Sequence, residues 1–233
     1  MDKKITKYGT IALSVLISIG VFLFWYIAYP HAMSYQEQYQ LFLWTSDYFV
    51  DRLSVPGGFA SWIGEFIVQF YYVEWLGALL LSLLLVAFGR AAGWIPAVLV
   101  LWLLGDPSVK LGYVVALLIA VGAHRLNTIK WSRLAWCEVA FVPVIYWLTG
   151  PLAWVYVLLR MHRYGWKSWP MPLYLLALQL LAYRFCLTQW TLEMTMMPAQ
   201  YYRTPMMMPT LMWLTPLVTV FTMVVQRRCL SAK

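Results

Sequence analysis

The chain has 233 residues, of which 63% are apolar and 11% are charged. A soluble fold of this length cannot cover so much apolar surface, so we exclude an ordinary globular domain, a disordered chain and a disulfide scaffold. The 17 Lys and Arg residues against 9 Asp and Glu give a net charge of +8. In a soluble protein that excess would suggest nucleic acid, but in a membrane protein the side on which charges fall matters more than their sum. We therefore expect the lipid bilayer, and no nucleic acid, as the partner.

The first apolar run extends from about Tyr8 to Tyr29 and follows a lysine-rich start. As a helix it is long enough to cross roughly 30 Å of hydrocarbon. The run is longer than the apolar core of a signal peptide and ends in Tyr29-Pro30-His31. It therefore predicts an uncleaved membrane anchor.

Seven further apolar runs follow, so the chain is predicted to cross the membrane about eight times. Two pairs of short runs are joined by the turn sequences Asp106–Ser108 and Thr149–Pro151, and each pair predicts a tight helical hairpin. The seven runs are Trp75–Gly89, Trp94–Gly105, Leu111–Ala123, Leu134–Leu148, Leu152–Leu159, Pro170–Cys186 and Pro209–Gln226.

With eight crossings the loops alternate, and all but four of the 17 Lys and Arg residues share one side; the four are Arg52, Lys110, Arg184 and Arg203. This asymmetry predicts that both termini lie in the cytoplasm. We expect the membrane to be the bacterial inner membrane. Most acids fall on the other side. Because acids do not set topology, this second sorting indicates either ordinary polar loops or an acidic outward-facing site. The outer acids are Glu37, Asp47, Asp51, Glu65, Glu74, Asp106 and Glu193.

The outer segment 34–73 has the periodicity of two amphipathic helices separated by the break Val55–Gly58. We expect both to lie flat in the outer interface, each with one apolar face buried and one polar face in water. The predicted apolar face of 34–53 holds Tyr35, Tyr39, Phe42, Leu43, Phe49, Val50 and Leu53, opposite Gln36, Glu37, Gln40, Asp47 and Asp51. In the second helix Phe59, Ile63, Phe66 and Phe70 lie opposite Ser61, Glu65 and Gln69.

The predicted fold is all-α. It is a single integral membrane domain over residues 1–233, a polytopic helix bundle of about eight hydrophobic helices, with the amphipathic helical pair of residues 34–73 on the outer side.

The polar face of the first amphipathic helix is the candidate site. Asp47 and Asp51 lie one helical turn apart and Glu37 falls on the same broad face, so these carboxylates suit a divalent cation, or a general base beside a bound substrate. Interfacial helices that only anchor usually carry Lys and Arg on the wet face instead. The competing interpretation is a solvated helix face with Arg52 as its counter-ion.

Other ionisable residues offer fewer options. Arg203, in the last outer segment, presents a planar guanidinium that suits a lipid phosphate, or else pairs with Glu193. Glu138 and Arg184 are the charged residues expected at membrane depth, where a transport path would need them. The sequence contains no nucleotide-binding glycine loop, no Gly-x-Ser-x-Gly and no His-Glu-x-x-His.

The stretch from Tyr35 to Leu76 carries a family resemblance. Its segments YQEQYQLFLWTSDYF, SVPGG, GEFIVQFYY and EWLGAL resemble an uncharacterised, domain-of-unknown-function family of bacterial polytopic membrane proteins, and the resemblance extends through the rest of the chain. Some members are longer, with a soluble region after the membrane part. The resemblance implies a membrane class and no particular activity.

A more distant resemblance is architectural. One helix, an outer loop of two amphipathic helices with acids, and then many crossings resemble the N-terminal module of the C-type membrane glycosyltransferases. Those enzymes use lipid-linked sugar donors, and a carboxylate of the first outer loop serves as base or metal ligand. The resemblance implies Glu37 and Asp47 as catalytic residues. From the chemistry of the residues themselves we expect Asp51 and Arg203 to bind substrate. The sequence has no tight Asp-x-Asp or Asp-Glu pair.

Three functions remain open. The chain is a transferase acting on a lipid-linked substrate, a non-catalytic module that docks another envelope protein, or a carrier for a lipid or small solute. A transferase requires a cavity beside Glu37 or Asp47, a docking module requires an aromatic and Met-rich outer surface, and a carrier requires a polar path at mid-membrane. Whether the protein is an enzyme is therefore left open.

Overall fold

A computed structural model of the chain describes residues 3–130, 135–202 and 210–231, which form helices and turns with no strand among them. The all-helical prediction is confirmed for these residues. The helices are α1 (Lys3–Leu23), η1 (Phe24–Ala28), α2 (Pro30–Tyr39), α3 (Ser46–Leu53), α4 (Gly58–Val68), η2 (Gln69–Tyr72), α5 (Glu74–Ala92), α6 (Trp94–Leu104), α7 (Leu111–Lys130), α8 (Ala135–Thr149), η3 (Gly150–Leu152), α9 (Ala153–Tyr164), η4 (Gly165–Ser168), α10 (Pro170–Phe185), α11 (Leu192–Met196), α12 (Pro198–Tyr201) and α13 (Leu211–Ser231).

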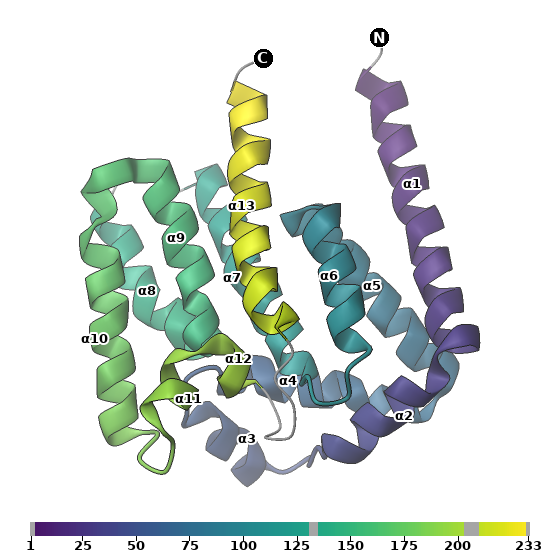
Figure 1. Ribbon diagram of the computed structural model, residues 1–233, viewed down its shortest axis with the longest axis horizontal. Coiled ribbons are helices and arrows are strands. Elements are labelled where there is room, and N and C mark those ends of the chain that lie inside the picture. Colours follow the sequence, from purple (N-terminus) through teal and green to yellow (C-terminus); the bar gives the residue numbers. More distant parts are fainter. Residues whose placement is uncertain (1–2, 131–134, 203–209, 232–233) are drawn as a thin grey trace.

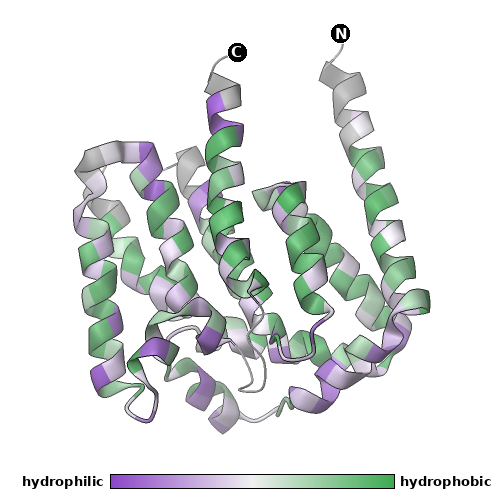
Figure 2. Ribbon diagram, in the orientation of Figure 1, coloured by the Kyte–Doolittle hydropathy of each residue, from purple (hydrophilic) through white to green (hydrophobic). Residues whose placement is uncertain are grey.

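The helices are arranged in a bundle and a layer across one end of it (Figure 1). Helices α1, α5 to α10 and α13 run along the bundle, and both chain termini lie at the same end, which we call the terminal end. Helices α2, α3, α4, α11 and α12 lie at the opposite end and form what we call the base layer. Apolar residues fill the middle of the bundle helices, while polar residues gather in the base layer and at the terminal end of α7, α9 and α13 (Figure 2).

Each of the eight apolar runs overlaps one bundle helix, but only three stretches of the described chain are long and apolar enough to span a membrane: Ile11–Ala28, Glu74–Ala92 and Val139–Tyr164. Fewer stretches than the eight expected crossings therefore meet this criterion. Turns end several helices early, and α6, with 11 residues, is only about 16 Å long at 1.5 Å per residue. Three apolar spans are compatible with a membrane protein.

The core of the bundle is α7, which packs against α4, α5, α8 and α9. Its residues Leu111–Leu117 are all buried. Helix α6 instead packs against α5 and α13, so α6 and α7 do not form the predicted hairpin. Helices α8 and α9 do pack together across the turn at Gly150. Helix α1 is peripheral, because only 17% of its apolar span is buried.

The base layer differs from the predicted amphipathic pair. Residues 34–53 are divided between α2 and α3 by an extended segment at residues 40–45. The predicted faces of the first part are reversed: Gln36 and Gln40 are buried, while Tyr35 and Tyr39 are 55% and 60% exposed. The reason is hydrogen bonding, since a buried amide is stable when it has partners.

Those partners are the ends of two bundle helices. The Gln36 side-chain amide donates to the carbonyl of Leu104 over 2.9 Å, at the end of α6. The backbone N–H of Leu111, the first residue of α7, donates to Oε1 of Gln40 over 3.3 Å. Helix ends leave backbone groups without intrahelical partners, and these two glutamines satisfy one at each end. They thereby attach the base layer to the α6–α7 connection.

Two close backbone approaches set the position of α4. A Cβ added to Gly64 would lie 2.4 Å from the backbone nitrogen of Gly112, so only glycine allows α4 to cross α7 at this distance. Gly57, at the start of α4, has φ of +76° and donates its N–H to the Trp147 carbonyl over 2.7 Å. The Tyr202 hydroxyl lies against this turn, because a Cβ at Gly57 would be 2.5 Å from it, and the same hydroxyl donates to the Thr149 carbonyl over 2.9 Å.

Candidate functional site

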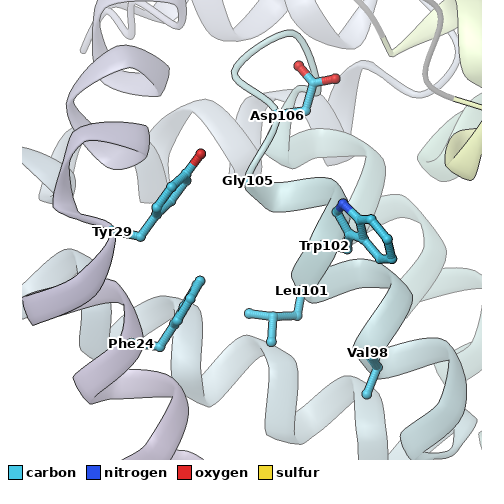
Figure 3. A pocket seen from close by; sticks show the side chains of 7 residues that line it. All are labelled: Phe24, Tyr29, Val98, Leu101, Trp102, Gly105 and Asp106. Atoms are coloured by element: carbon cyan, nitrogen blue, oxygen red, sulfur yellow. The ribbon is translucent and has the colours of Figure 1, made fainter.

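The candidate site is a groove of about 450 Å³ between η1 and α6. Figure 3 shows Phe24 and Tyr29 on one wall and Val98, Leu101 and Trp102 on the other. The Asp106 carboxylate and the Tyr29 hydroxyl lie toward one end of the groove in this view. The groove is thus apolar along most of its length and polar at one end.

The first wall exists because α1 ends in a π-helical turn. Such turns are rare and occur often at functional sites, because they redirect side chains. Here Trp25 is buried, with 1% of its surface exposed, and anchors the turn to the bundle. Phe24 and Tyr29 remain on the other side, with their rings stacked at a centroid distance of 5.9 Å.

The second wall follows from the spacing of α6. Val98, Leu101 and Trp102 recur at i, i+3 and i+4 and therefore share one face of the helix. Val98 is 60% and Trp102 is 69% exposed. No protein side chain covers this face within the described residues, so its apolar surface is available to a ligand or to lipid.

The polar end is formed by the connection between α6 and α7. Oδ1 of Asp106 accepts the backbone N–H of Ser108 over 2.9 Å, which orients the carboxylate. The N–H of Lys110 donates to the Tyr202 carbonyl over 3.2 Å, and the Gln36 side-chain amide donates to the Leu104 carbonyl. These two hydrogen bonds fix both ends of the connection. A carboxylate has about four acceptor positions, so Asp106 is able to accept further hydrogen bonds from a bound group.

A second charged group, which the sequence did not reveal, lies between α3 and α4. Glu65 is buried, at 4% exposure, and pairs with Arg52 over 2.8 Å. The Tyr48 hydroxyl donates to Oε2 of Glu65 over 2.5 Å and accepts from Arg52 over 3.0 Å. Glu65 was predicted to lie on a wet face, and that prediction was wrong, because Arg52 and Tyr48 supply the ion pair and hydrogen bond that replace water around its carboxylate.

The surroundings of this group change its acid–base properties. Burial raises the pKa of Tyr48, and the hydrogen bond to Glu65 raises it further. Burial by itself would lower the pKa of Arg52, but the attraction of Glu65 and the Tyr48 hydrogen bond raise it overall. Burial lowers the pKa of Lys110, against the attraction of Glu65. Because its acid and base neutralise each other, the group acts as a structural connection between α3 and α4.

The predicted site residues that the structure describes lie outside the groove between η1 and α6. Glu37 is half-buried on α2, while Asp47 and Asp51 are exposed on α3, and none of the three lines the groove. Arg203 lies outside the described residues. No three His, Cys, Asp or Glu side chains lie close enough together to share a metal ion in the part of the chain that the structure describes.

Two signals in the sequence point to what was missed. Asp106 is an acid in a turn directly after an apolar run, which places a carboxylate at the end of an exposed helix face. Arg52 is the one basic residue in the outer segment 34–73, so a buried acid of that segment has a single local partner there. Neither signal shows by itself which acid is buried.

Comparison with known proteins identifies the family. Neither the curated proteins nor the solved structures gave a match. Therefore the resemblance to C-type glycosyltransferases stays a prediction. The prediction of an uncharacterised family is confirmed, because residues 4–232 match the model of a family of unknown function, DUF6057, and the chain belongs to that family.

Proposed function

We propose that this chain is a multi-pass protein of the bacterial inner membrane that binds a lipid in the groove between η1 and α6. The lipid class is one whose head group donates hydrogen bonds, through hydroxyls or an ammonium. The single observation that carries this proposal is the combination of an apolar groove of about 450 Å³ with the Asp106 carboxylate at one end.

The membrane location rests on how residues are distributed along the bundle. Three stretches are long and apolar enough to span a bilayer, and apolar residues fill the middle of the bundle helices (Figure 2). Basic residues occupy the last turns of α5, α9 and α13. By the positive-inside rule the terminal end faces the cytoplasm and the base layer, with the groove's acidic end, faces outward.

The selectivity of the groove resides in its polar end. Inside a bilayer, lipid chains are as apolar as the protein wall, so the walls alone favour no particular lipid. Asp106 and the Tyr29 hydroxyl give the groove a preference for particular head groups, because a carboxylate accepts hydrogen bonds from hydroxyls or an ammonium and repels a phosphate. The groove therefore selects for the head group.

This lipid site extends the predicted transferase function. A sugar on a lipid carrier supplies many hydroxyl donors, and Asp106 is the carboxylate that lines the groove. Glu37 and Asp47 lie outside it, so sugar transfer with these residues as catalysts requires a substrate that reaches beyond the groove. Lipid binding does not require a ligand that extends to these residues, so we propose lipid binding ahead of sugar transfer.

The lipids retained by the purified protein test the proposal. After extraction in native membrane particles, we expect mass spectrometry to find one lipid with a hydroxyl or ammonium head group enriched over the bulk membrane. Val98→Phe fills the groove and Asp106→Asn removes its charge, so both variants lose the enrichment. Val144→Phe, at a similarly exposed valine of α8 outside the groove, keeps it. Lipids that match the bulk membrane, or an unchanged pattern in Val98→Phe, would contradict the proposal.

A second candidate is docking of an envelope partner on the base layer. Leu41, Leu43 and Trp44 are 77%, 57% and 77% exposed in the segment between α2 and α3. Trp44 contacts Phe42 and Phe66, so the exposed ring is held rigidly. Aromatic residues of this kind dominate binding at interfaces. Crosslinking from position 44 in intact cells tests this candidate: a single protein adduct supports docking, and lipid adducts alone reject it.

A further inference from the structure

A second cavity, of about 310 Å³, lies toward the terminal end of the bundle. It is formed by α1, the last turn of α5, the first turn of α6 and the end of α13, and its lining includes Ser14, Arg90, Gly93, Trp94 and Gln226. It shares no lining residue with the groove between η1 and α6.

Arg90 supplies the charge of this cavity. It lies in the last turn of α5, is exposed, and donates from Nη1 to the hydroxyl of Ser14 over 3.2 Å. Ser14 is buried, with 8% of its surface exposed, and its contact orients the guanidinium from α1. A guanidinium has five N–H donors in a planar fork, so further donors are available to a ligand.

Gln226 supplies a second polar group, from α13. Its amide nitrogen lies so close to Gly93 that a Cβ there would be 2.7 Å from it. Gly93 has φ of +112°, a conformation that favours glycine, and it turns the chain from α5 into α6. The amide is therefore held against the start of α6.

The start of α6 adds a third contribution. Its N-cap is Gly93, which has no side chain to accept the first N–H groups of the helix. The N-terminus of an 11-residue helix carries a partial positive charge that favours anions. The lining contains no Asp or Glu. The ionised and dipolar groups of the cavity are thus suited to a negative charge.

We propose that this cavity binds the phosphate of an anionic phospholipid head group. A guanidinium is the side chain best matched to phosphate oxygens. Leu13 of α1 and Trp94 of α6 also line the cavity. Their apolar side chains offer a surface for acyl chains, so a phosphate with attached acyl chains fits better than a free phosphate ion. The lipid is opposite in charge preference to the one proposed for the groove near Asp106, and it lies at the other end of the bundle.

The test uses the full chain in nanodiscs that hold equal amounts of phosphatidylglycerol and phosphatidylcholine. Native mass spectrometry counts the phosphatidylglycerol that remains bound after release from the disc. We expect preferential retention by the native chain and about tenfold weaker retention by Arg90→Gln, because a charge-assisted hydrogen bond is lost. The matched control is Arg227→Gln, which removes the same charge from the exposed residue after Gln226. An equal loss in both variants would show diffuse attraction and overturn the proposal.

Two further measurements keep the result interpretable. Gln226→Ala leaves the contact between Arg90 and Ser14 in place, so this variant is expected to fold even if Arg90→Gln does not. Because it removes a polar group of the cavity, it should weaken phosphatidylglycerol retention, and unchanged retention would count against the site.

Inorganic phosphate is then added as a competitor. Displacement by millimolar inorganic phosphate would identify a free-phosphate site and overturn the lipid assignment, whereas no displacement supports it. Val98→Phe and Asp106→Asn do not touch this cavity, so the two lipid proposals fail independently.

Discussion

The acids of α3 and the acid of α4 differ in almost every respect, although all three belong to the same outer segment. Asp47 and Asp51 are exposed, whereas Glu65 is buried against Arg52 and Tyr48. Periodicity placed all three on wet faces. The burial of these acids differs because a carboxylate is stable in the interior only with a cation and hydrogen bonds to replace water. The availability of partners, not the helical pattern, determines which acid is buried.

Removing the buried charge is the strongest way to test this comparison. Glu65→Gln removes the ion-pair partner of the half-buried Arg52 and weakens the Tyr48 hydrogen bond. We expect the free energy of unfolding to fall by about 1.5–3 kcal/mol, measured by thermal and denaturant unfolding in detergent. Asp47→Asn, which removes the same charge from an exposed residue of α3, is the control. Equal losses in the two variants would show that burial makes no difference.

The position of Glu65 depends on the glycine before it. Gly64→Ala places a methyl group against the backbone of Gly112, so α4 must move away from α7 and the ion pair must shift. We expect a loss of about 1–3 kcal/mol in unfolding free energy. Gly122→Ala is the control, because a Cβ there has open space and alanine favours the helix. If Gly64→Ala unfolds no more easily than Gly122→Ala, the close crossing of α4 and α7 is not needed.

The buried glutamines extend the comparison to uncharged groups. Gln36→Leu leaves the Leu104 carbonyl without its side-chain donor, which we expect to cost about 1 kcal/mol. Gln38→Leu changes an exposed residue of the same helix and should have little effect on stability. The two unfolding midpoints are measured together in one detergent. A larger effect of Gln38→Leu would mean that α2 presents the face that its sequence pattern predicts.

Alkaline pH gives a smaller effect with a definite sign. The pKa of Tyr48 is raised above 10.0 in the folded chain. Above that pH the unfolded chain loses its phenol proton first, so the unfolded state binds fewer protons and stability falls until the folded pKa is passed. Tyr48→Phe lacks this contribution. The stability difference between the native chain and Tyr48→Phe should therefore shrink as the pH rises past 10.0; a constant difference would contradict the raised pKa.

Asp47, which is exposed, and Glu37, which is half-buried, are expected to give the smallest effect on stability. Asp47→Asn and Glu37→Gln should each change the unfolding free energy by less than about 0.5 kcal/mol, because neither residue is fully buried. Both variants then serve as clean tests of the predicted transferase. At native expression levels, loss of sugar transfer from a lipid-linked donor in either variant would support a catalytic acid on the base layer. Unchanged sugar transfer in both variants would exclude Glu37 and Asp47 as the catalytic acid and leave Asp106, which lines the groove, as the next residue to test.

Part of the fold and of the site was accessible from sequence pattern. Each apolar run corresponds to a bundle helix, because a long run of apolar residues between turn signals favours a helix with buried or lipid-compatible faces. Asp106 could be placed in a turn at the end of such a run. Its role as the polar end of a groove could not, because the opposite wall comes from η1, about 80 residues earlier in the chain.

The sequence by itself determined the helical class and the membrane-compatible composition, since these depend on composition and on short-range order. It also determined the family, through the match over residues 4–232. Tertiary structure decided that Gln36 and Gln40 face inward, that Glu65 rather than Asp47 is buried, and that α6 packs against α13 rather than α7. The physical reason is that periodicity shows only that two faces of a helix differ. The burial of a polar face depends on donors, acceptors and charges that distant segments bring to it.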